Sequence, residues 1–103
     1  MHIVNVNLTR ATMDSVAPFK ELLQEIIGAE KFKIVVNLSK CEFIDSSIVG
    51  VLVHSNKKVT PMGGDLRLAG LNPAVYSMME LTRMHRIFES FPTVEAAVAS
   101  FGR

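Results

Sequence analysis

The stretch KIVVNLSKCEFIDSSIVGVLV, residues 33–53, decides the fold of this chain. It opens on Ile34-Val35-Val36, a continuous apolar run that is typical of a strand buried on both faces of a sheet. It closes on apolar residues that cover most of a helix circumference, and Asp45-Ser46-Ser47 before them favour a helix start. We therefore predict a central strand over residues 33–38 and a buried helix over residues 46–59.

The preceding residues predict another strand followed by an amphipathic helix. Residues 2–8 alternate between apolar and polar side chains, which is typical of a strand with one face in water. Over residues 15–27 the apolar spacing becomes helical, with Asp14 or Ser15 as the cap and Gly28 as the stop. The apolar stripe of this helix comprises Val16, Phe19, Leu22, Leu23, Ile26 and Ile27.

The residues that follow repeat the strand-helix alternation twice. Residues 65–69 predict a strand, and Asn72-Pro73 opens a third helix as a cap and a first-position proline. Residues 86–89, around Ile87-Phe88, predict a short last strand, and Pro92-Thr93 opens a fourth helix. The apolar residues of these two helices are Val75, Met78, Met79 and Leu81 in the third and Val94, Ala97, Val98 and Phe101 in the fourth.

The predicted element order is β-α-β-α-β-α-β-α. This alternation is typical of an α/β fold with a mainly parallel sheet and right-handed crossovers. We expect one domain over residues 1–103, with a sheet of four to five strands and about four helices, because a chain of this length has no room for two domains.

Composition and charge exclude several classes of function. The chain has 11 basic and 10 acidic residues, so nothing in its charge predicts binding to a nucleic acid or to an anionic membrane. No leader is visible, and the apolar run at residues 48–53 is too short to span a bilayer. The single cysteine, Cys41, is expected to be a small buried hydrophobe in a reducing cytoplasm.

The residues that usually carry enzyme chemistry are scattered. The histidines His2, His54 and His85 have no metal-ligand spacing to one another, to cysteine or to carboxylates. No phosphate-binding glycine loop and no nucleophile elbow is present, and Gly63-Gly64 precedes a strand, as expected for a turn. We therefore expect no catalytic residue, no metal and no cofactor, and a protein that is not an enzyme.

Residues 45–47 are the one candidate site, and two interpretations of them stay open. Asp and Ser are common helix caps, so these residues can serve the fold alone. They also lie where a buried strand ends and a buried helix begins, which is where parallel α/β proteins bind ligands and partners. A hydroxyl projecting into solvent from this turn could accept a phosphate of charge roughly −1.5 to −2, which a helix N-terminus tolerates.

Several segments resemble the STAS family, which contains the anti-sigma factor antagonists. The resemblance rests on Val-Val-Asn-Leu-Ser at 35–39, Phe-Ile-Asp-Ser-Ser at 43–47, the strand and turn at 63–73, and the closing segments at 87–91 and 93–97. It covers about residues 30–101, and the motifs are specific in this order and spacing.

The resemblance implies a bacterial, cytoplasmic signalling protein that regulates transcription by partner switching. Antagonists of this family bind an anti-sigma factor that is also a serine kinase, and this binding frees the sigma factor. Carried over, Ser47 is the phosphorylation site, phosphorylation ends the binding, and a phosphatase acting on Ser47 resets the protein. The implied partner-binding surface is Asp45, Ser46, Ser47, Ile48 and Val49.

Two departures from the family pattern bear on the partner. The family commonly has Gly directly after the phosphorylated residue, whereas here the β-branched Ile48 is expected to narrow the approach of the kinase. The family often begins with two strands and Gly-x-x-Asp, whereas here we expect about one strand, and residues 9–13 lack that motif. Apolar surface left by a shortened N-terminal region would support a homodimer.

Other functions on the same fold stay open. A STAS adaptor subunit that is not phosphorylated, for example the cytoplasmic component of a lipid-trafficking ABC transporter, would need no modified serine. A nucleotide-binding or enzymatic activity is a third alternative, but the sequence contains no phosphate-binding loop to support it.

Overall fold

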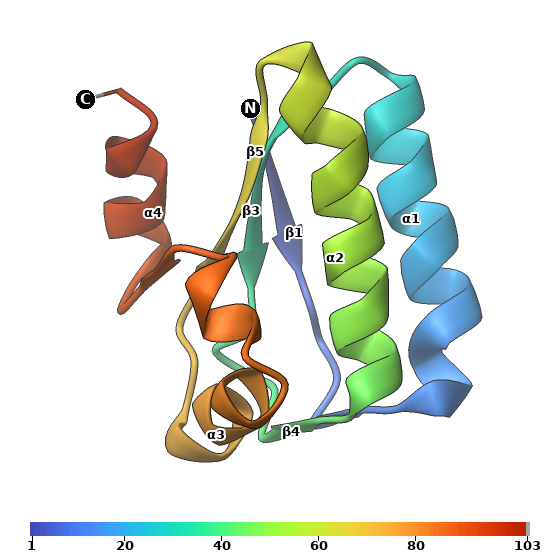
Figure 1. Ribbon diagram of the computed structural model, residues 1–103, viewed down its shortest axis with the longest axis vertical. Helices are drawn as coiled ribbons and strands as arrows, with labels where there is room; N and C mark the ends of the chain where they lie inside the picture. The colour runs from blue at the N-terminus through green and yellow to red at the C-terminus, as the bar shows by residue number, and fades with distance from the viewer. Residues whose placement is uncertain (103) are drawn as a thin grey trace.

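The computed structural model describes residues 1–102, and its main sheet consists of four parallel strands in the order β1-β3-β5-β6 (Figure 1). The strands are β1 (His2–Asn5), β3 (Lys33–Asn37), β5 (Asp65–Ala69) and β6 (Ser90–Phe91). The helices are α1 (Val16–Gly28), α2 (Ser46–Val59), α3 (Pro73–Leu81) and α4 (Val94–Ser100). The predicted α/β fold class is confirmed.

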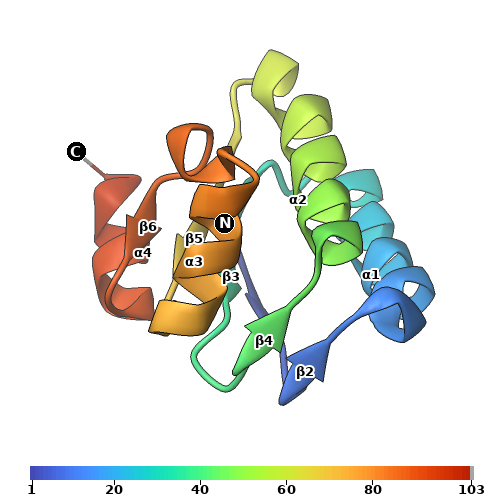
Figure 2. The same ribbon diagram turned by 60° about the horizontal axis from the view of Figure 1, so that its bottom comes forward.

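The helices cover the sheet unequally. Helices α1 and α2 lie side by side on one face, α4 lies on the opposite face, and α3 lies across the end where the strands finish (Figures 1 and 2). Strand β3 is buried on both faces, because Ile34 and Val36 belong to the large core under α1 and α2 while Val35 packs in a small core under α4. This agrees with the prediction of a central strand.

A second, two-stranded sheet joins distant parts of the chain. Strands β2 (Arg10–Ala11) and β4 (Phe43–Ile44) pair in parallel and lie side by side beyond the end of the main sheet (Figure 2). The carbonyl of Thr9 accepts the backbone N–H groups of Glu42 and Phe43 at 2.7 and 3.3 Å. The prediction of about one strand before α1 was wrong, and strand β4 lies between β3 and α2, where no strand was predicted.

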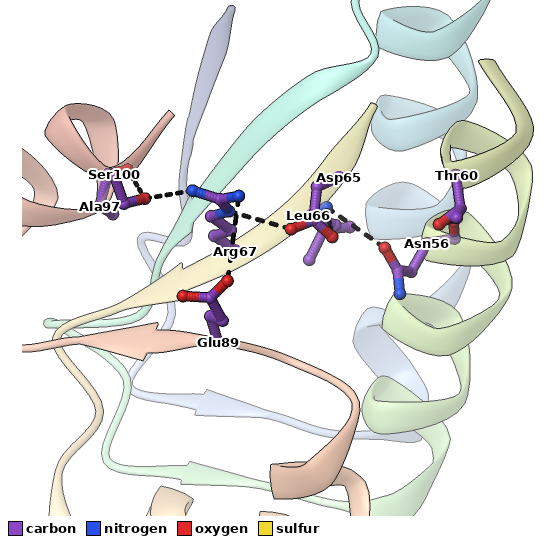
Figure 3. A network of polar contacts seen from close by, with 8 residues as sticks. All are labelled: Asn56, Thr60, Asp65, Leu66, Arg67, Glu89, Ala97 and Ser100. Atoms are coloured by element: carbon purple, nitrogen blue, oxygen red, sulfur yellow. Dashed lines mark hydrogen bonds and ion pairs between the residues drawn. The ribbon is translucent and has the colours of Figure 1, made fainter. Parts of the chain in front are cut away.

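Helix α4 is attached to the sheet through Arg67 of β5 (Figure 3). The guanidinium donates to the Asp65 carboxylate at 2.9 Å and to the Ser100 hydroxyl at 2.5 Å, and it lies 3.9 Å from the Glu89 carboxylate. It also stacks over the Phe101 ring, 4.0 Å from the centroid. One half-buried arginine thus connects β5 to both ends of the closing β6-α4 unit.

The starts of three helices follow the predicted caps. Asp45, Asn72 and Thr93 each accept a backbone N–H in the first turn of the helix that follows. Helix α1 differs, because Ser15 occupies its cap position without making a side-chain cap hydrogen bond. A 3₁₀ turn over Met13–Ser15 leads directly into α1 and replaces the side-chain cap.

Three further predictions need correction. The last strand lies at Ser90–Phe91 and not at residues 86–89, because a 3₁₀ turn over Met84–Arg86 inserts Phe88 into the large core. Leu22 of α1 is 41% exposed and Leu81 of α3 is 78% exposed, so neither helix buries its full apolar stripe. Strand β1 ends at Asn5, and Leu8 is also exposed.

None of the helices within residues 1–102 has both the length and the apolar character that crossing a membrane requires.

Candidate functional site at the start of helix α2

The candidate site is organised by the Asp45 side chain at the cap of α2. Its Oδ1 accepts the backbone N–H groups of Ser47 and Ile48 at 3.1 and 3.2 Å. Its Oδ2 accepts the backbone N–H of Met13 at 2.9 Å, and its own N–H donates to the Ala11 carbonyl at 3.2 Å. The predicted cap is confirmed, and the same carboxylate also fastens the segment before α1 to the start of α2.

The Ser47 hydroxyl belongs to the same cluster. It donates to Oδ1 of Asp45 at 2.5 Å, and the Ser47 side chain is half-buried. The hydroxyl was predicted to project into solvent, and its hydrogen bond to Asp45 corrects that prediction. A short bond from a neutral hydroxyl to a carboxylate is of the charge-assisted kind, which is stronger than a bond between neutral groups.

These hydrogen bonds stabilise the ionised form of Asp45. The pKa of its carboxyl is lowered from the ordinary value of 3.8, chiefly by the Ser47 hydroxyl and further by the backbone N–H groups of Ile48, Met13 and Ser47. Partial burial opposes this and raises the pKa, but the hydrogen bonds prevail. Asp45 is therefore a fixed negative charge beside the Ser47 hydroxyl at neutral pH.

The five residues of the predicted partner-binding surface divide into two groups. Ser46 is exposed, and Asp45 and Ser47 are half-buried. The side chains of Ile48 and Val49 are 1% and 3% exposed and pack in the large core, so Ile48 offers no side-chain surface to a partner, and Val49 only contributes to the wall of a surface hollow beside α2. The expected obstruction by Ile48 is likewise corrected, because its branched side chain points inward, away from Ser47.

The structure adds the segment Thr9–Met13 to this site, which sequence reasoning missed. Met13 is 74% exposed, and the Arg10 guanidinium lies 4.5 Å from the centroid of the Phe43 ring, over β4. These residues lie more than 30 positions before Asp45, so no spacing rule connects them. The alternation of apolar and polar residues could not reveal a strand of only two residues.

The remaining candidates for chemistry stay apart. Cys41 is fully buried, and its Sγ lies 3.1 Å from the carbonyl of Phe43. His2 lies on β1, His54 on the exposed side of α2 and His85 in the 3₁₀ turn before β6. Among residues 1–102, no three His, Cys, Asp or Glu side chains come together to hold a metal ion.

The fold and this site agree with a known domain family, because the family model of the STAS domain matches residues 12–97. The chain belongs to the STAS-domain family. The match covers both the candidate site at the start of α2 and the segment at Met13 whose N–H binds Asp45.

Two bacterial relatives of this STAS domain carry a functional name. It is 32% identical over 79 residues to a Thermotoga neapolitana homologue of a candidate anti-sigma factor antagonist, spanning 77% of this chain and 70% of that protein. It is 31% identical over 84 residues to the candidate anti-sigma factor antagonist of Thermotoga maritima, spanning 82% and 74%.

A solved structure supports the same assignment of this STAS domain. The crystal structure of a candidate anti-sigma factor antagonist from Thermotoga maritima superposes with a TM-score of 0.87 at 27% identity. The superposition covers 98% of this chain and 88% of that one. The family and the fold implied by the sequence are therefore confirmed.

Proposed function

We propose that this STAS domain is an anti-sigma factor antagonist that binds an anti-sigma factor with serine-kinase activity and releases it when Ser47 is phosphorylated. The observation that carries the proposal is the hydrogen bond from the Ser47 hydroxyl to the Asp45 cap of α2. The names of the Thermotoga relatives support the class of partner. The proposed setting is the bacterial cytoplasm, with transcription regulated without direct contact to nucleic acid.

Phosphorylation would change this hydrogen bond in a defined way. The phosphoryl group that the kinase transfers from ATP, with ADP as the leaving group, replaces the proton on the Ser47 oxygen, so this oxygen can no longer donate to Oδ1 of Asp45. The new group brings a charge of roughly −1.5 to −2 beside a carboxylate that is already ionised. Repulsion between the two groups therefore replaces an attraction.

The rest of the domain would tolerate the added charge. The backbone N–H groups in the first turn of α2 and the helix dipole favour a negative group at this end. The side chain of Ile48 lies in the core and leaves the approach to Ser47 open. We therefore expect the phosphorylated protein to remain folded while its surface at Asp45 and Ser47 changes.

Phosphorylation of Ser47 would also affect the segment at Met13, which is bonded to Asp45. Oδ2 of Asp45 holds the N–H of Met13, and Met13 is the most exposed apolar side chain of the site. A shift of the carboxylate away from a phosphate would loosen this bond. The proposed docking surface therefore comprises Asp45, Ser46 and Ser47 together with Met13.

The test is intact mass measurement of the protein purified from its native cytoplasm, with mapping of the peptide covering residues 41–57. One phosphate on Ser47, absent from Ser47→Ala and retained in the neighbouring control Ser46→Ala, would support the proposal. Ser47→Ala should bind the kinase without release, and Ser47→Asp should fold and bind weakly.

Absence of a phosphate on Ser47 would favour the alternative function, a STAS adaptor subunit that is not phosphorylated. If a cognate kinase and ATP leave Ser47 unmodified, and the protein co-purifies stably with a transporter ATPase, the STAS domain is a constitutive subunit. If a phosphate is found, a phosphatase acting on Ser47 completes the cycle, and removal of the phosphate should restore binding. Sedimentation of both forms would also show whether the free protein is a homodimer.

A further inference from the structure

Gly50 is a residue of α2 that the fold does not require. It lies in the second turn of the helix, is exposed, and an added Cβ would meet no atom within 4 Å. Glycine is among the least favourable residues inside a helix, and alanine at the same position would be better. The absence of a side chain at Gly50 therefore has no explanation within residues 1–102.

Two surface hollows meet at Gly50. One, of about 250 Å³, lies between α1 and α2 and is lined by Lys20 and Ser47. The other, of about 400 Å³, lies on the opposite side of α2 and is lined by Ser46 and Lys57. Gly50 and His54 line both hollows, so the missing side chain makes a low point between them.

The charged side chains that line these two hollows are lysines, and the ionised Asp45 carboxylate lies beyond Ser47 at the start of α2. Lys20 and Lys57 are exposed, one beside each hollow, and no aspartate or glutamate lines either hollow. The acidic residues Glu21 and Glu25 of α1 line a separate hollow, together with Pro18 and Leu22. The lining of the two hollows at Gly50 thus contributes positive charge only, although the whole chain carries a net charge of only +1.

We propose that this face of α2 receives an acidic segment of the anti-sigma factor, which packs its backbone or a large side chain against Gly50 between Lys20 and Lys57. This inference rests on the proposed function and specifies the chemistry of the partner. The lysines are complementary in charge to an acidic segment. The face is also continuous with the proposed docking surface, because Ser46 and Ser47, the first two residues of α2, line the two hollows.

The same arrangement explains how a phosphate would cause release. Ser47 and Lys20 line one hollow, so a phosphate on Ser47 adds a charge of roughly −1.5 to −2 beside the lysine that attracts the acidic segment. The phosphate repels the segment and also competes for Lys20. Release then needs no rearrangement of the fold.

The experiment measures binding by calorimetry to each serine-kinase anti-sigma factor of the source organism, purified singly, at low and moderate salt. We expect Gly50→Ala to melt at a higher temperature than the wild type and yet to bind at least tenfold more weakly, with Gly50→Leu weaker still. We expect Lys20→Glu and Lys57→Glu each to weaken binding about tenfold, and higher salt to weaken wild-type binding.

Matched controls lie on the outer side of α1. Gly28→Ala is also an exposed helical glycine with open space, and Glu25→Lys also changes charge, and neither should alter the affinity. If a kinase binds the wild type and all the Gly50 and lysine variants equally, the docking proposal is wrong while the proposed function stands. If no kinase binds the wild type, the proposed function fails and the docking proposal fails with it.

Discussion

Replacing Asp45 with alanine removes several hydrogen bonds in one change. The N–H groups of Ser47 and Ile48 and the hydroxyl of Ser47 lose their acceptor, Oδ1 of Asp45. The N–H of Met13 loses Oδ2. Loss of a helix cap costs about 1 kcal/mol, within a range of about 0.5–2. Loss of the bond from the Met13 N–H costs about 1 kcal/mol more, which is less than for a buried bond to a charged group because this bond is exposed to solvent.

The expected total for Asp45→Ala is therefore a loss of about 2 kcal/mol in the free energy of unfolding. An unfolding entropy of about 2.1 cal/mol/K per residue converts this into a fall of roughly 9 °C in the melting temperature. Urea unfolding followed by circular dichroism gives the free energy directly, with an unchanged m-value as the check on two-state behaviour. The stability of Asp45→Asn should lie between that of the wild type and that of Asp45→Ala. Asparagine caps a helix well but lacks the charge that attracts the Met13 N–H.

The pH dependence gives the same prediction a second measurement. The folded-state pKa of Asp45 is lowered, so the stabilisation from its ionised form is present above the ordinary value of 3.8 and is lost as the pH falls through the lowered value. Between pH 5 and pH 2 the wild type should therefore lose more stability than Asp45→Asn. A cost below about 0.5 kcal/mol for Asp45→Ala, together with parallel pH profiles, would refute the central role assigned to this carboxylate.

Three other substitutions, with Gly28→Ala as a control, test the fold that supports the site. Leu52→Ala opens a cavity beneath α2 and should cost about 2–5 kcal/mol in urea unfolding. Gly64→Ala places a Cβ 2.0 Å from the Phe32 carbonyl oxygen and should cost about 3 kcal/mol or more, whereas Gly28→Ala should be neutral or stabilising by up to about 1 kcal/mol. Arg67→Leu should speed hydrogen exchange in α4 at least tenfold, while exchange in α2 stays unchanged.

The fold was readable from the sequence wherever apolar residues followed a regular period. The structure places α2 at Ser46–Val59 and β5 at Asp65–Ala69, as predicted, because each has a strong pattern and a clear cap or turn at its start. The last strand was misplaced because apolar residues at Ile87-Phe88 suggested a strand. Phe88 is instead buried from the bend that follows the 3₁₀ turn at Met84–Arg86, and periodicity cannot distinguish such a residue from one in a strand.

The candidate site was readable only in part. Asp45 was identified as a cap because capping depends on residues a few positions away. The hydrogen bond from Met13 joins residues 32 positions apart and depends on the pairing of β2 with β4, which no local rule predicts. The low point at Gly50 was also missed, since the sequence does not show whether a side chain at a helical glycine would have room.

The strictly parallel pairing of the strands has a consequence for how the chain matures on the ribosome. Every strand pair joins segments separated by an intervening stretch of roughly 20–30 residues, so each pairing closes a long loop before it gains any contact. Such non-local pairing makes folding slow compared with a helical bundle of the same length. The strand that completes the sheet, β6, and the buried Phe88 before it come after all the other strands in the chain order. The nascent chain should therefore remain protease-sensitive until β6 has left the exit tunnel, and the Asp45 cluster should become stable only then.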